Sequence, residues 1–388
     1  MDDTALRLTL NTSLASVDRD QWNAVANPAG MRFDPFLTWE FLEAMEASGA
    51  VSPQMGWTPM HLTILGPANQ LRAAMPMYAK THSYGEFVFD HSWADAIERA
   101  GGQYYPKLLA AVPFSPVTGR RRLVPPGPDA SRLEDALVAG AVQVADEHEF
   151  SSLHINFVSE TESEDLTRIG LLARTDQQFH FMNEGYETFD DFLAALSSAK
   201  RKNLRKERAK AQDGLTIRHL TGDEIREADW DAFYVFYLDT SQRKWGSPYL
   251  NRETFRLIGE RMADKVLLVM AYDDDGQPIA GALNMIGSDT LYGRYWGCTV
   301  DKPMLHFEIC YYQAIDFALA NGLKYVEAGA QGGHKLARGY QPVITRSAHW
   351  VAHPGLRDAI TDYLARERDS VAREQDYLQE RMPFKKGE

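Results

Sequence analysis

The sequence predicts an α/β protein built from two halves that share one plan, each with a central mixed sheet flanked by helices. Two observations support this prediction. The chain has 388 residues, which is too long for one ordinary hydrophobic core. The order of elements expected over residues 135–196 also recurs over residues 310–367. In both stretches a helix is followed by a strand, an intervening segment, a second strand and a second helix.

The repeated elements are indicated by apolar periodicity and by turn residues. In the first half they are a helix at 135–150, strands at 153–159 and 177–182, and a helix at 188–196. In the second half they are a helix ending at 322, strands at 325–329 and 347–352, and a helix from 355. A hairpin precedes each set, at 61–80 and at 266–285, and the second contains the turn sequence DDDGQ. The match is one of element order, which favours an internal duplication.

The boundary between the halves is expected near a basic helix. We predict an N-terminal half over 1–180, a basic connecting helix over 181–214, and a C-terminal half over 215–388 that ends in a long amphipathic helix. Asp190 lies near the start of the connecting helix and the cations follow it, as the helix dipole favours. Gly214 is a natural stop.

The composition excludes several classes of protein. The net charge of −13 argues against general coating of nucleic acid. Two cysteines, Cys298 and Cys310, are too few for a disulfide framework or a four-cysteine metal site. We find no apolar run long enough to span a bilayer, and residues 1–13 do not resemble a secretory signal. We therefore expect a cytoplasmic protein with no bound metal.

Polar side chains concentrate where the strands of residues 278–352 end and where the helix of this stretch begins. Polar groups at the ends of elements, in a mostly apolar framework, are how α/β proteins build binding sites. We therefore expect these side chains to converge on one cleft. They are Arg294, Tyr295, Trp296, His306, Glu308, Glu327, Gln331, His334, Lys335, Arg338 and Tyr340.

The segment 200–210 holds seven basic residues and one acid. One interpretation is a solvated helix face. The other is a surface that binds the phosphates of a nucleotide, a cofactor or tRNA, with Lys202 and Arg205 as the leading candidates. Aromatic residues are absent from this segment, so stacking on single-stranded bases is not supported.

Three further patterns have two interpretations each. The glycines of 329–339 permit a ligand to approach the backbone N–H groups closely, or they only permit a tight crossover between elements. The segment matches neither the Walker pattern nor G-x-G-x-x-G. His306 and Cys310, four residues apart, form a nucleophile pair or a packed core thiol under a cap. The sequence Arg243-Lys244-Trp245 contacts an anion or an aromatic group, or it only ends a helix.

The second half resembles a GNAT acyltransferase domain in its hairpin at 266–286, the strand ending GRYWG, the helix from His306 and the strand YVEAG. The basic helix followed by a strand resembles the Fem-type duplicated GNAT proteins, which transfer aminoacyl groups in cell-wall peptide assembly. Nearly the whole chain resembles a bacterial GNAT-like family related to peptidoglycan biosynthesis or recognition. The most specific stretches are FDDFLAALSSAKRKNLRKERA, GALNMIGSDTLYGRYWGC, HFEICYYQAIDFALANGL and EAGAQGGHKLARGYQPV.

The resemblance implies tandem GNAT-like halves, each with a mixed, mostly antiparallel sheet. It also implies a splay between the strand ending at Trp296 and the strand ending at Gly329, where the acyl donor enters. The usual pyrophosphate turn belongs between Cys298 and His306, but the residues there include no glycine. Fem-type proteins also lack this turn, which favours a donor other than tightly bound coenzyme A.

The chemistry implied is transfer of an acyl or aminoacyl group from acyl-CoA or aminoacyl-tRNA to an amine by direct attack, without a tightly bound cofactor. Tyr340 matches the position of the GNAT acid, Glu327 is placed to take the amine proton, and Lys335 or Arg338 is placed to stabilise the oxyanion. Substrate contacts are expected from Arg294, Trp296, His306, Glu308, Gln331, His334, Arg338, Arg243, Lys244 and Trp245. The acceptor is a small-molecule or peptide amine, and tRNA is a possible partner.

Two alternatives come from other classes of protein. One is a non-catalytic protein that binds a peptidoglycan precursor or a protein partner. The other is a nucleic-acid-binding module built on the basic helix, which the acidic composition disfavours.

Overall fold

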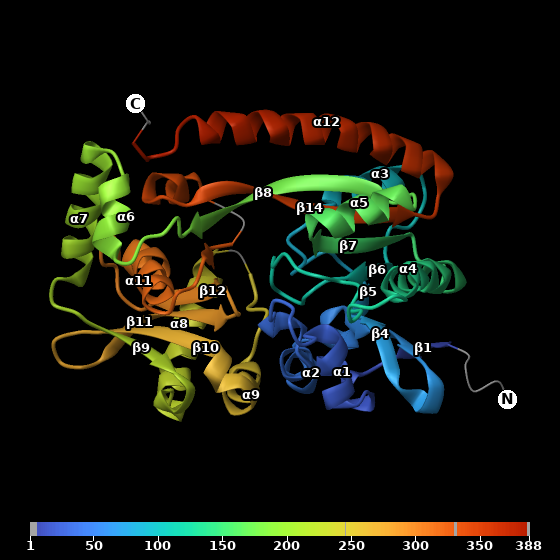
Figure 1. Cartoon of the computed structure of the whole chain (residues 1–388), viewed down its shortest axis with the longest axis horizontal. Helices are drawn as coiled ribbons and strands as arrows, with labels where there is room; N and C mark the ends of the chain where they lie inside the picture. The colour runs from blue at the N-terminus through green and yellow to red at the C-terminus, as the bar shows by residue number, and fades with distance from the viewer. Residues whose placement is uncertain (1–5, 245, 330–331, 386–388) are drawn as a thin grey trace. The chain divides into compact units, whose positions relative to one another are not determined.

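The computed structural model describes residues 6–244, 246–329 and 332–385 (Figure 1). The chain forms two compact units. Unit 1 comprises Met1–Asp176 and Ile344–Ala372, and unit 2 comprises Gln177–Val343 and Arg373–Glu388. Strands β8 (Leu172–Met182) and β14 (Gln341–Val351) and helix α12 (Pro354–Gln379) contribute residues to both units. Each unit is therefore assembled from two separate parts of the sequence.

Unit 1 contains a sheet in the order β2-β5-β6-β7-β14. Its strands are β2 (Trp57–Pro59), β5 (Met77–Lys80), β6 (Lys107–Ala110), β7 (Ser152–Val158) and the unit 1 part of β14. Only β6 and β7 pair in parallel. One face of this sheet packs on α4 (Ala130–Glu147), and Leu108 and Ile155 lie in the resulting apolar core.

The rest of unit 1 surrounds this sheet. A second, three-stranded sheet has the order β1-β3-β4, from β1 (Arg7–Asn11), β3 (His61–Leu65) and β4 (Leu71–Met75). The remaining α-helices of the unit are α1 (Arg19–Ala26), α2 (Trp39–Ala47), α3 (His91–Arg99) and α5 (Glu160–Arg168).

Unit 2 contains a sheet in the order β8-β13-β12-β11-β10-β9, in which only β12 and β13 pair in parallel. Its other strands are β9 (Thr216–Thr221), β10 (Val266–Tyr272), β11 (Pro278–Ile286), β12 (Thr290–Cys298) and β13 (Tyr325–Glu327). The α-helices between β8 and β10 are α6 (Phe189–Ala195), α7 (Ser198–Gln212), α8 (Glu227–Lys244) and α9 (Arg252–Met262). A further helix runs through α10 (Leu305–Phe307), a π-helical turn (Glu308–Tyr312) and α11 (Gln313–Ala320).

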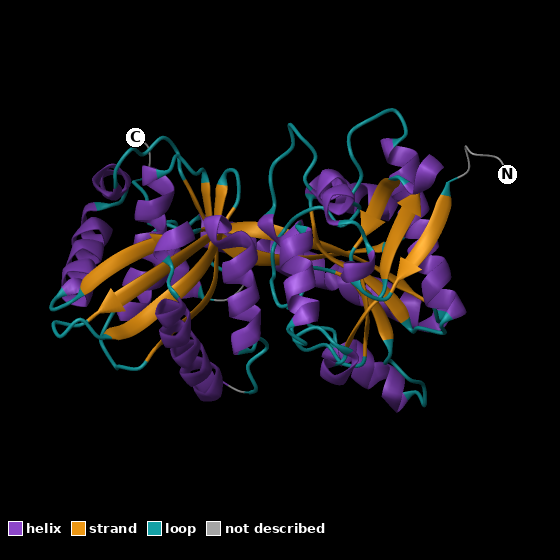
Figure 2. Cartoon of the chain, turned by 90° about the horizontal axis from the view of Figure 1, so that it is seen from below, coloured by secondary structure: helices purple, strands orange, loops and turns teal. Residues whose placement is uncertain are grey.

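Helices cover both faces of the unit 2 sheet, as Figure 2 shows. On one face α8 packs closely against β11 and β12, because Gly281 and Gly297 lie opposite each other in these strands. A Cβ atom at Gly297 would stand 1.9 Å from the carbonyl oxygen of Phe236 on α8. On the other face, Ile309 and Ile315 of the helix over 305–320 belong to the apolar core that includes the inward side chains of the sheet.

The predicted fold class is confirmed. Each unit has a mixed, mostly antiparallel sheet between helices, and the central strand order corresponds: β5-β6-β7-β14 in unit 1 and β11-β12-β13-β8 in unit 2. In both, the middle pair is parallel and the flanking pairs are antiparallel. In the described part of the chain, no helix has both the length and the apolar character needed to cross a bilayer.

The compact units divide the chain differently from the sequence-based boundaries. Residues 344–372 belong to unit 1, because β14 pairs with β7 there. The stretch 181–214 belongs to unit 2 and is not one connecting helix. It forms α6 and α7, separated at Leu196, whose backbone is extended and bridges to Phe384.

Candidate functional site

The parallel strands of unit 2 separate soon after they pair. Strands β12 and β13 pair over three positions only, from Thr290 with Tyr325 to Tyr292 with Glu327. Strand β12 then continues to Cys298 along β11 without β13. A strand edge that loses its partner offers backbone groups that an extended ligand can bind. The splay predicted from the sequence therefore has a structural counterpart at the end of β13.

A β-bulge lies in β12 at the same level. Leu283 pairs with Tyr295 but Asn284 pairs with Gly293, so Arg294 is an extra residue on β12. Bulges re-aim side chains and are common beside active sites. Here the bulge follows directly on the point where β13 ends.

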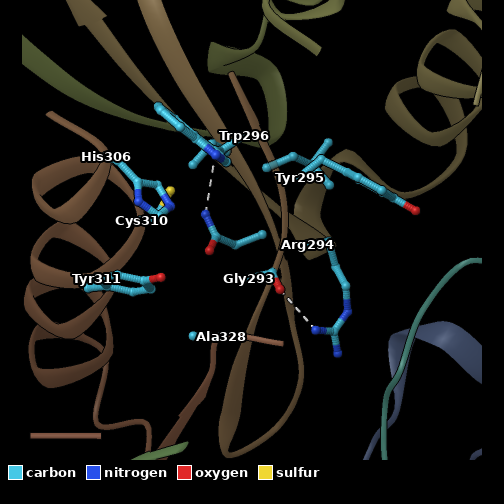
Figure 3. A pocket seen from close by; sticks show the side chains of 11 residues that line it. Gly293, Arg294, Tyr295, Trp296, His306, Cys310, Tyr311 and Ala328 are labelled. Atoms are coloured by element: carbon cyan, nitrogen blue, oxygen red, sulfur yellow. Dashed lines mark hydrogen bonds between the residues drawn. The ribbon is translucent and has the colours of Figure 1, made fainter. Parts of the chain in front are cut away.

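A small cavity of about 80 Å³ lies beside the separated strands (Figure 3). Its walls come from β11, from β12, from the helix over 305–320 and from the residue after β13. The lining residues are Ala282, Leu283, Asn284, Gly293, Arg294, Tyr295, Trp296, His306, Cys310, Tyr311 and Ala328. The structure thus brings together four of the predicted site residues, Arg294, Tyr295, Trp296 and His306.

Aromatic rings form the helix side of the cavity. The rings of Trp296 and His306 are in contact in a tilted arrangement, with centroids 4.3 Å apart and an interplanar angle of 34°. The ring of Tyr311 lies 5.3 Å from that of His306. The π-helical turn carries both Cys310 and Tyr311, and such turns occur frequently at functional sites.

Glu327, the predicted base, ends β13 and is followed by Ala328 in the cavity wall. Its carboxylate forms a salt bridge of 3.2 Å with Arg294, and both side chains are almost completely buried. Figure 3 shows the Arg294 side chain directed away from the Trp296 and His306 rings. The pair therefore fixes the carboxylate at the edge of the cavity.

Lys335, predicted to stabilise an oxyanion, is buried in the loop after β13. Its Nζ donates hydrogen bonds to the carbonyl oxygens of Ala328 (2.6 Å) and Gly329 (2.9 Å). Positive φ angles at Gly329 and Gly332 shape this loop. In this arrangement the ammonium group ties the loop to the end of β13, behind the cavity wall.

Tyr340, the predicted acid, is fully buried in the core of unit 2. Its hydroxyl donates to the backbone carbonyl of Tyr311, at 3.3 Å. Burial raises the pKa of this hydroxyl well above its usual value, and the neighbouring Tyr311 adds to the effect. The hydroxyl therefore reaches the back of a residue that lines the cavity, while Tyr340 itself does not line it.

His334 and Arg338 lie near the cavity but outside its wall. Nε2 of His334 is 3.0 Å from the hydroxyl of Tyr311. The guanidinium of Arg338 stacks on the ring of Phe307 and forms a 2.8 Å salt bridge with Glu207 of α7. Both side chains therefore support the helix that forms one wall.

Glu308 and Arg243 point elsewhere. Glu308 is completely buried and accepts hydrogen bonds from Gln212 (2.8 Å) and Gln313 (2.6 Å), with Arg208 at 3.3 Å. Burial raises the pKa of Glu308 although Arg208 opposes the shift. The Arg243 guanidinium donates to the carbonyl oxygen of Cys298, at 2.7 Å. Neither residue lines the cavity.

The predicted phosphate-binding residues lie on α7. Lys202 and Arg205 are exposed, and Arg205 pairs with Asp190 at 2.9 Å. The one acid of the helix, Glu207, is turned toward the hydroxyl of Tyr312. Gln331, Trp245 and the side chain of Lys244 lie outside the described residues.

Four other lining residues carry no strong signal in the sequence: Asn284, Tyr311 and the apolar residues Ala282 and Leu283. Asn284 is the one polar side chain of β11, PIAGALNMI, and a lone amide inside an apolar strand was the available signal. The π-helical turn that carries Tyr311 has no comparable signature in the sequence.

A mixed sheet with one parallel pair recurs in both units, and in unit 2 that pair separates beside a cavity; this arrangement defines a GNAT-like fold of the duplicated type. Residues 13–386 match the profile of the FemAB-like family, described as peptidoglycan biosynthesis/recognition. The chain therefore belongs to the FemAB-like family, as the resemblance indicated.

Solved structures show the same fold. The crystal structure of FemX has 10% sequence identity to this chain. The aligned region covers 92% of this chain and 100% of the FemX chain, and the TM-score is 0.55. The C-terminal domain of a putative lysylphosphatidylglycerol synthetase from Agrobacterium fabrum is 11% identical and covers 91% of this chain and 96% of that domain, with a TM-score of 0.54. At such identities the likeness concerns the fold. A comparison with curated protein sequences finds no match.

Proposed function

We propose that the chain is an N-acyltransferase or aminoacyltransferase that moves an acyl or aminoacyl group from acyl-CoA or aminoacyl-tRNA to an amine by direct attack. The observation that carries the proposal is the separation of β12 and β13 beside a small cavity, in a chain of the FemAB-like family. The acceptor is a small-molecule or peptide amine of peptidoglycan assembly. No covalent intermediate on the protein is required.

Direct attack needs a positioned carbonyl, a deprotonated amine and a proton for the leaving group. The open edge of β12 is suited to hold the amide groups of a donor, which would direct the acyl group toward the cavity. Glu327 accepts the proton of the attacking amine, directly or through water, and Arg294 positions its carboxylate.

Lys335 and Tyr340 complete the proposed machinery. Lys335 stabilises the negative charge that develops on the carbonyl oxygen, after it leaves the carbonyl of Ala328. Tyr340 supplies the proton for the leaving group, after its hydroxyl leaves the carbonyl oxygen of Tyr311, to which it donates in this structure. Lys202 and Arg205 of α7 contact phosphates of the donor.

A second candidate function is non-catalytic recognition of a peptidoglycan precursor. It is favoured by the contacts of the three catalytic candidates, because Glu327, Lys335 and Tyr340 each bind another group of the protein. In such a protein the cavity and the strand edge hold a ligand without transfer.

The test offers the protein each donor class separately. Pooled acyl-CoA and charged tRNA are incubated with amine-bearing peptidoglycan peptides, and donor consumption and product mass are followed by mass spectrometry. We expect transfer from one class, and loss of at least a hundredfold in rate in Glu327→Gln. Glu260→Gln, at an exposed position of α9, is the control. Peptide binding without consumption of either donor would reject transfer and establish the recognition function.

A further inference from the structure

The cavity wall contains a buried hydrogen-bond donor whose role the proposed mechanism does not explain. Nε1 of Trp296 is shielded from solvent, and within the described residues it has no hydrogen-bond partner. His306 covers one face of the indole ring, as Figure 3 shows. Buried N–H groups are nearly always bonded, so a lone donor in the wall of a cavity indicates a missing acceptor.

A second polar group in the same wall is also poorly satisfied. Asn284 is almost completely buried, and its amide nitrogen reaches the carbonyls of Leu267 and Ala282 only at 3.4 Å. This exceeds the usual N–H···O distance of about 2.7–3.2 Å. No described residue donates to its Oδ1. Asn284 therefore has an acceptor to offer where Trp296 offers a donor.

The size and charge of the cavity limit what can enter. A dry protein cavity of roughly 150 Å³ holds benzene, so about 80 Å³ has room for roughly three or four non-hydrogen atoms. Apart from Arg294, which is paired with Glu327, no charged side chain lines it among the described residues. The occupant is therefore short and uncharged.

We propose that this cavity receives the acyl part of the donor, and that Trp296 and Asn284 select a short acyl group with a hydrogen-bonding substituent next to its carbonyl. A hydroxyl or an uncharged amino group fits, because each accepts a bond from Nε1 of Trp296 and donates one to Oδ1 of Asn284. An apolar acyl group of the same shape would leave Nε1 of Trp296 and Oδ1 of Asn284 without partners. A site built to bond a polar group of its substrate discriminates strongly against an analogue that lacks this group. The inference rests on the proposed function.

The test measures binding of the acyl part alone, so it needs neither donor carrier nor transfer. Protein with ¹⁵N-labelled indole groups is titrated with glycolamide and with propionamide, which differ only in a hydroxyl against a methyl group. The chain has eight tryptophans, and Trp296→Phe identifies the relevant signal by its loss. We expect glycolamide to shift the Nε1–H resonance of Trp296 and to bind at least tenfold more tightly than propionamide. Hexanamide is too long and should not bind.

In Trp296→Phe the two amides should bind with similar affinity. The matched control is Trp230→Phe, a buried tryptophan of α8 that does not line the cavity, where the preference should persist. Equal affinities in the unaltered protein, or a preference that survives Trp296→Phe, would overturn the inference. If Trp296→Phe weakens the binding of both amides equally, the indole N–H donates to the amide carbonyl that they share. That result would also overturn the inference.

A variant that fails to fold does not remove the test, because the titration of the unaltered protein decides by itself. Thermal unfolding of each variant identifies that case. Failure of the proposed function gives a different result. Neither donor is then consumed, whether or not the protein binds glycolamide more tightly than propionamide. The amide preference with no transfer would leave a selective binding protein, whereas transfer without the preference would refute only the selection by Trp296 and Asn284.

Discussion

Replacement of Lys107 by methionine should destabilise unit 1 more than any ordinary surface change. Lys107 is completely buried on β6, and its Nζ forms ion pairs with Asp90 and with Glu86 (2.7 Å) and a hydrogen bond with Ser83 (2.8 Å). Methionine fills a similar volume but leaves two buried carboxylates without this cation. Removing one partner of a buried ion pair costs about 3–5 kcal/mol. We expect a loss in this range at pH 7, measured by urea unfolding followed by circular dichroism.

The pKa values give this prediction a second signature. Burial by itself would raise the pKa of Asp90, but the Lys107 ammonium, with His154 and Ser83, outweighs burial and holds this pKa below its usual value. Without Lys107 the carboxyls bind protons more readily in the folded state. The stability lost in Lys107→Met should therefore shrink as the pH falls from 7 toward 4.

The matched control neutralises the carboxylates as well. Lys107→Met combined with Glu86→Gln and Asp90→Asn removes all three charges, and it should recover much of the loss because no buried charge remains unpaired. A loss below about 1 kcal/mol in Lys107→Met, or a triple variant no more stable than the single one, would refute the reasoning.

Three further changes test other parts of the molecule. The buried rings of His154 and His349 share a 2.7 Å Nδ1···Nδ1 hydrogen bond. Burial lowers the pKa of His154 to about 3 and moves that of His349 in the same direction, so stability present above pH 6.5 is lost as pH falls toward 3. A double His→Asn variant should lose less stability between pH 7 and 5, measured by urea unfolding. Gly297→Ala should cost about 1–3 kcal/mol, because its Cβ meets the backbone of α8. Lys202→Ala/Arg205→Ala should weaken binding of a phosphate-bearing donor roughly a hundredfold or more without unfolding.

Each of these changes has a control. Gly127→Ala introduces a Cβ that meets no atom within 4 Å and should be nearly neutral, so equal losses in the two alanine variants would contradict the packing argument. Lys324→Ala/Arg168→Ala removes the same charge from exposed positions away from α7. Unchanged affinity for both donor classes in Lys202→Ala/Arg205→Ala would leave α7 as a solvated face. An acid sensitivity that survives removal of both histidines would assign it to other groups.

The sequence predicted the parts of the fold that depend on local pattern. The hairpin of β10 and β11 follows from two apolar runs around DDDGQ, and the repeated element order predicted matching sheets. The composition of the units depends instead on pairing between distant strands. Strand β14 returns to β7, and nothing local in its sequence distinguishes that partner from one in the nearer half. For the same reason residues 344–372 were assigned to the C-terminal half, whereas the compact units place them in unit 1.

The sequence predicted those parts of the candidate site for which the position of a residue on its strand or helix determines whether it reaches the cavity. Trp296 and His306 both line the cavity, because a strand end and a helix start meet at the splay. The partners of long side chains were not predictable, since a lysine reaches many groups from one backbone position. Lys335 binds two carbonyl oxygens of its own loop, and Arg205 binds Asp190. Periodicity does not encode such choices.

The two units use the same pair of parallel strands in opposite ways. In unit 2 the pair ends beside a cavity lined by Trp296 and His306. In unit 1 the corresponding strands β6 and β7 carry Lys107 and His154. The ammonium group of Lys107 pairs with Asp90. The hydroxyl of Tyr104 bonds to both Asp90 and Nε2 of His154. A site whose charges are already matched by the protein gains little from a ligand, because binding would exchange one set of bonds for another. The proposed acyl site therefore lies in unit 2, whereas a buried charge cluster occupies the corresponding strands of unit 1.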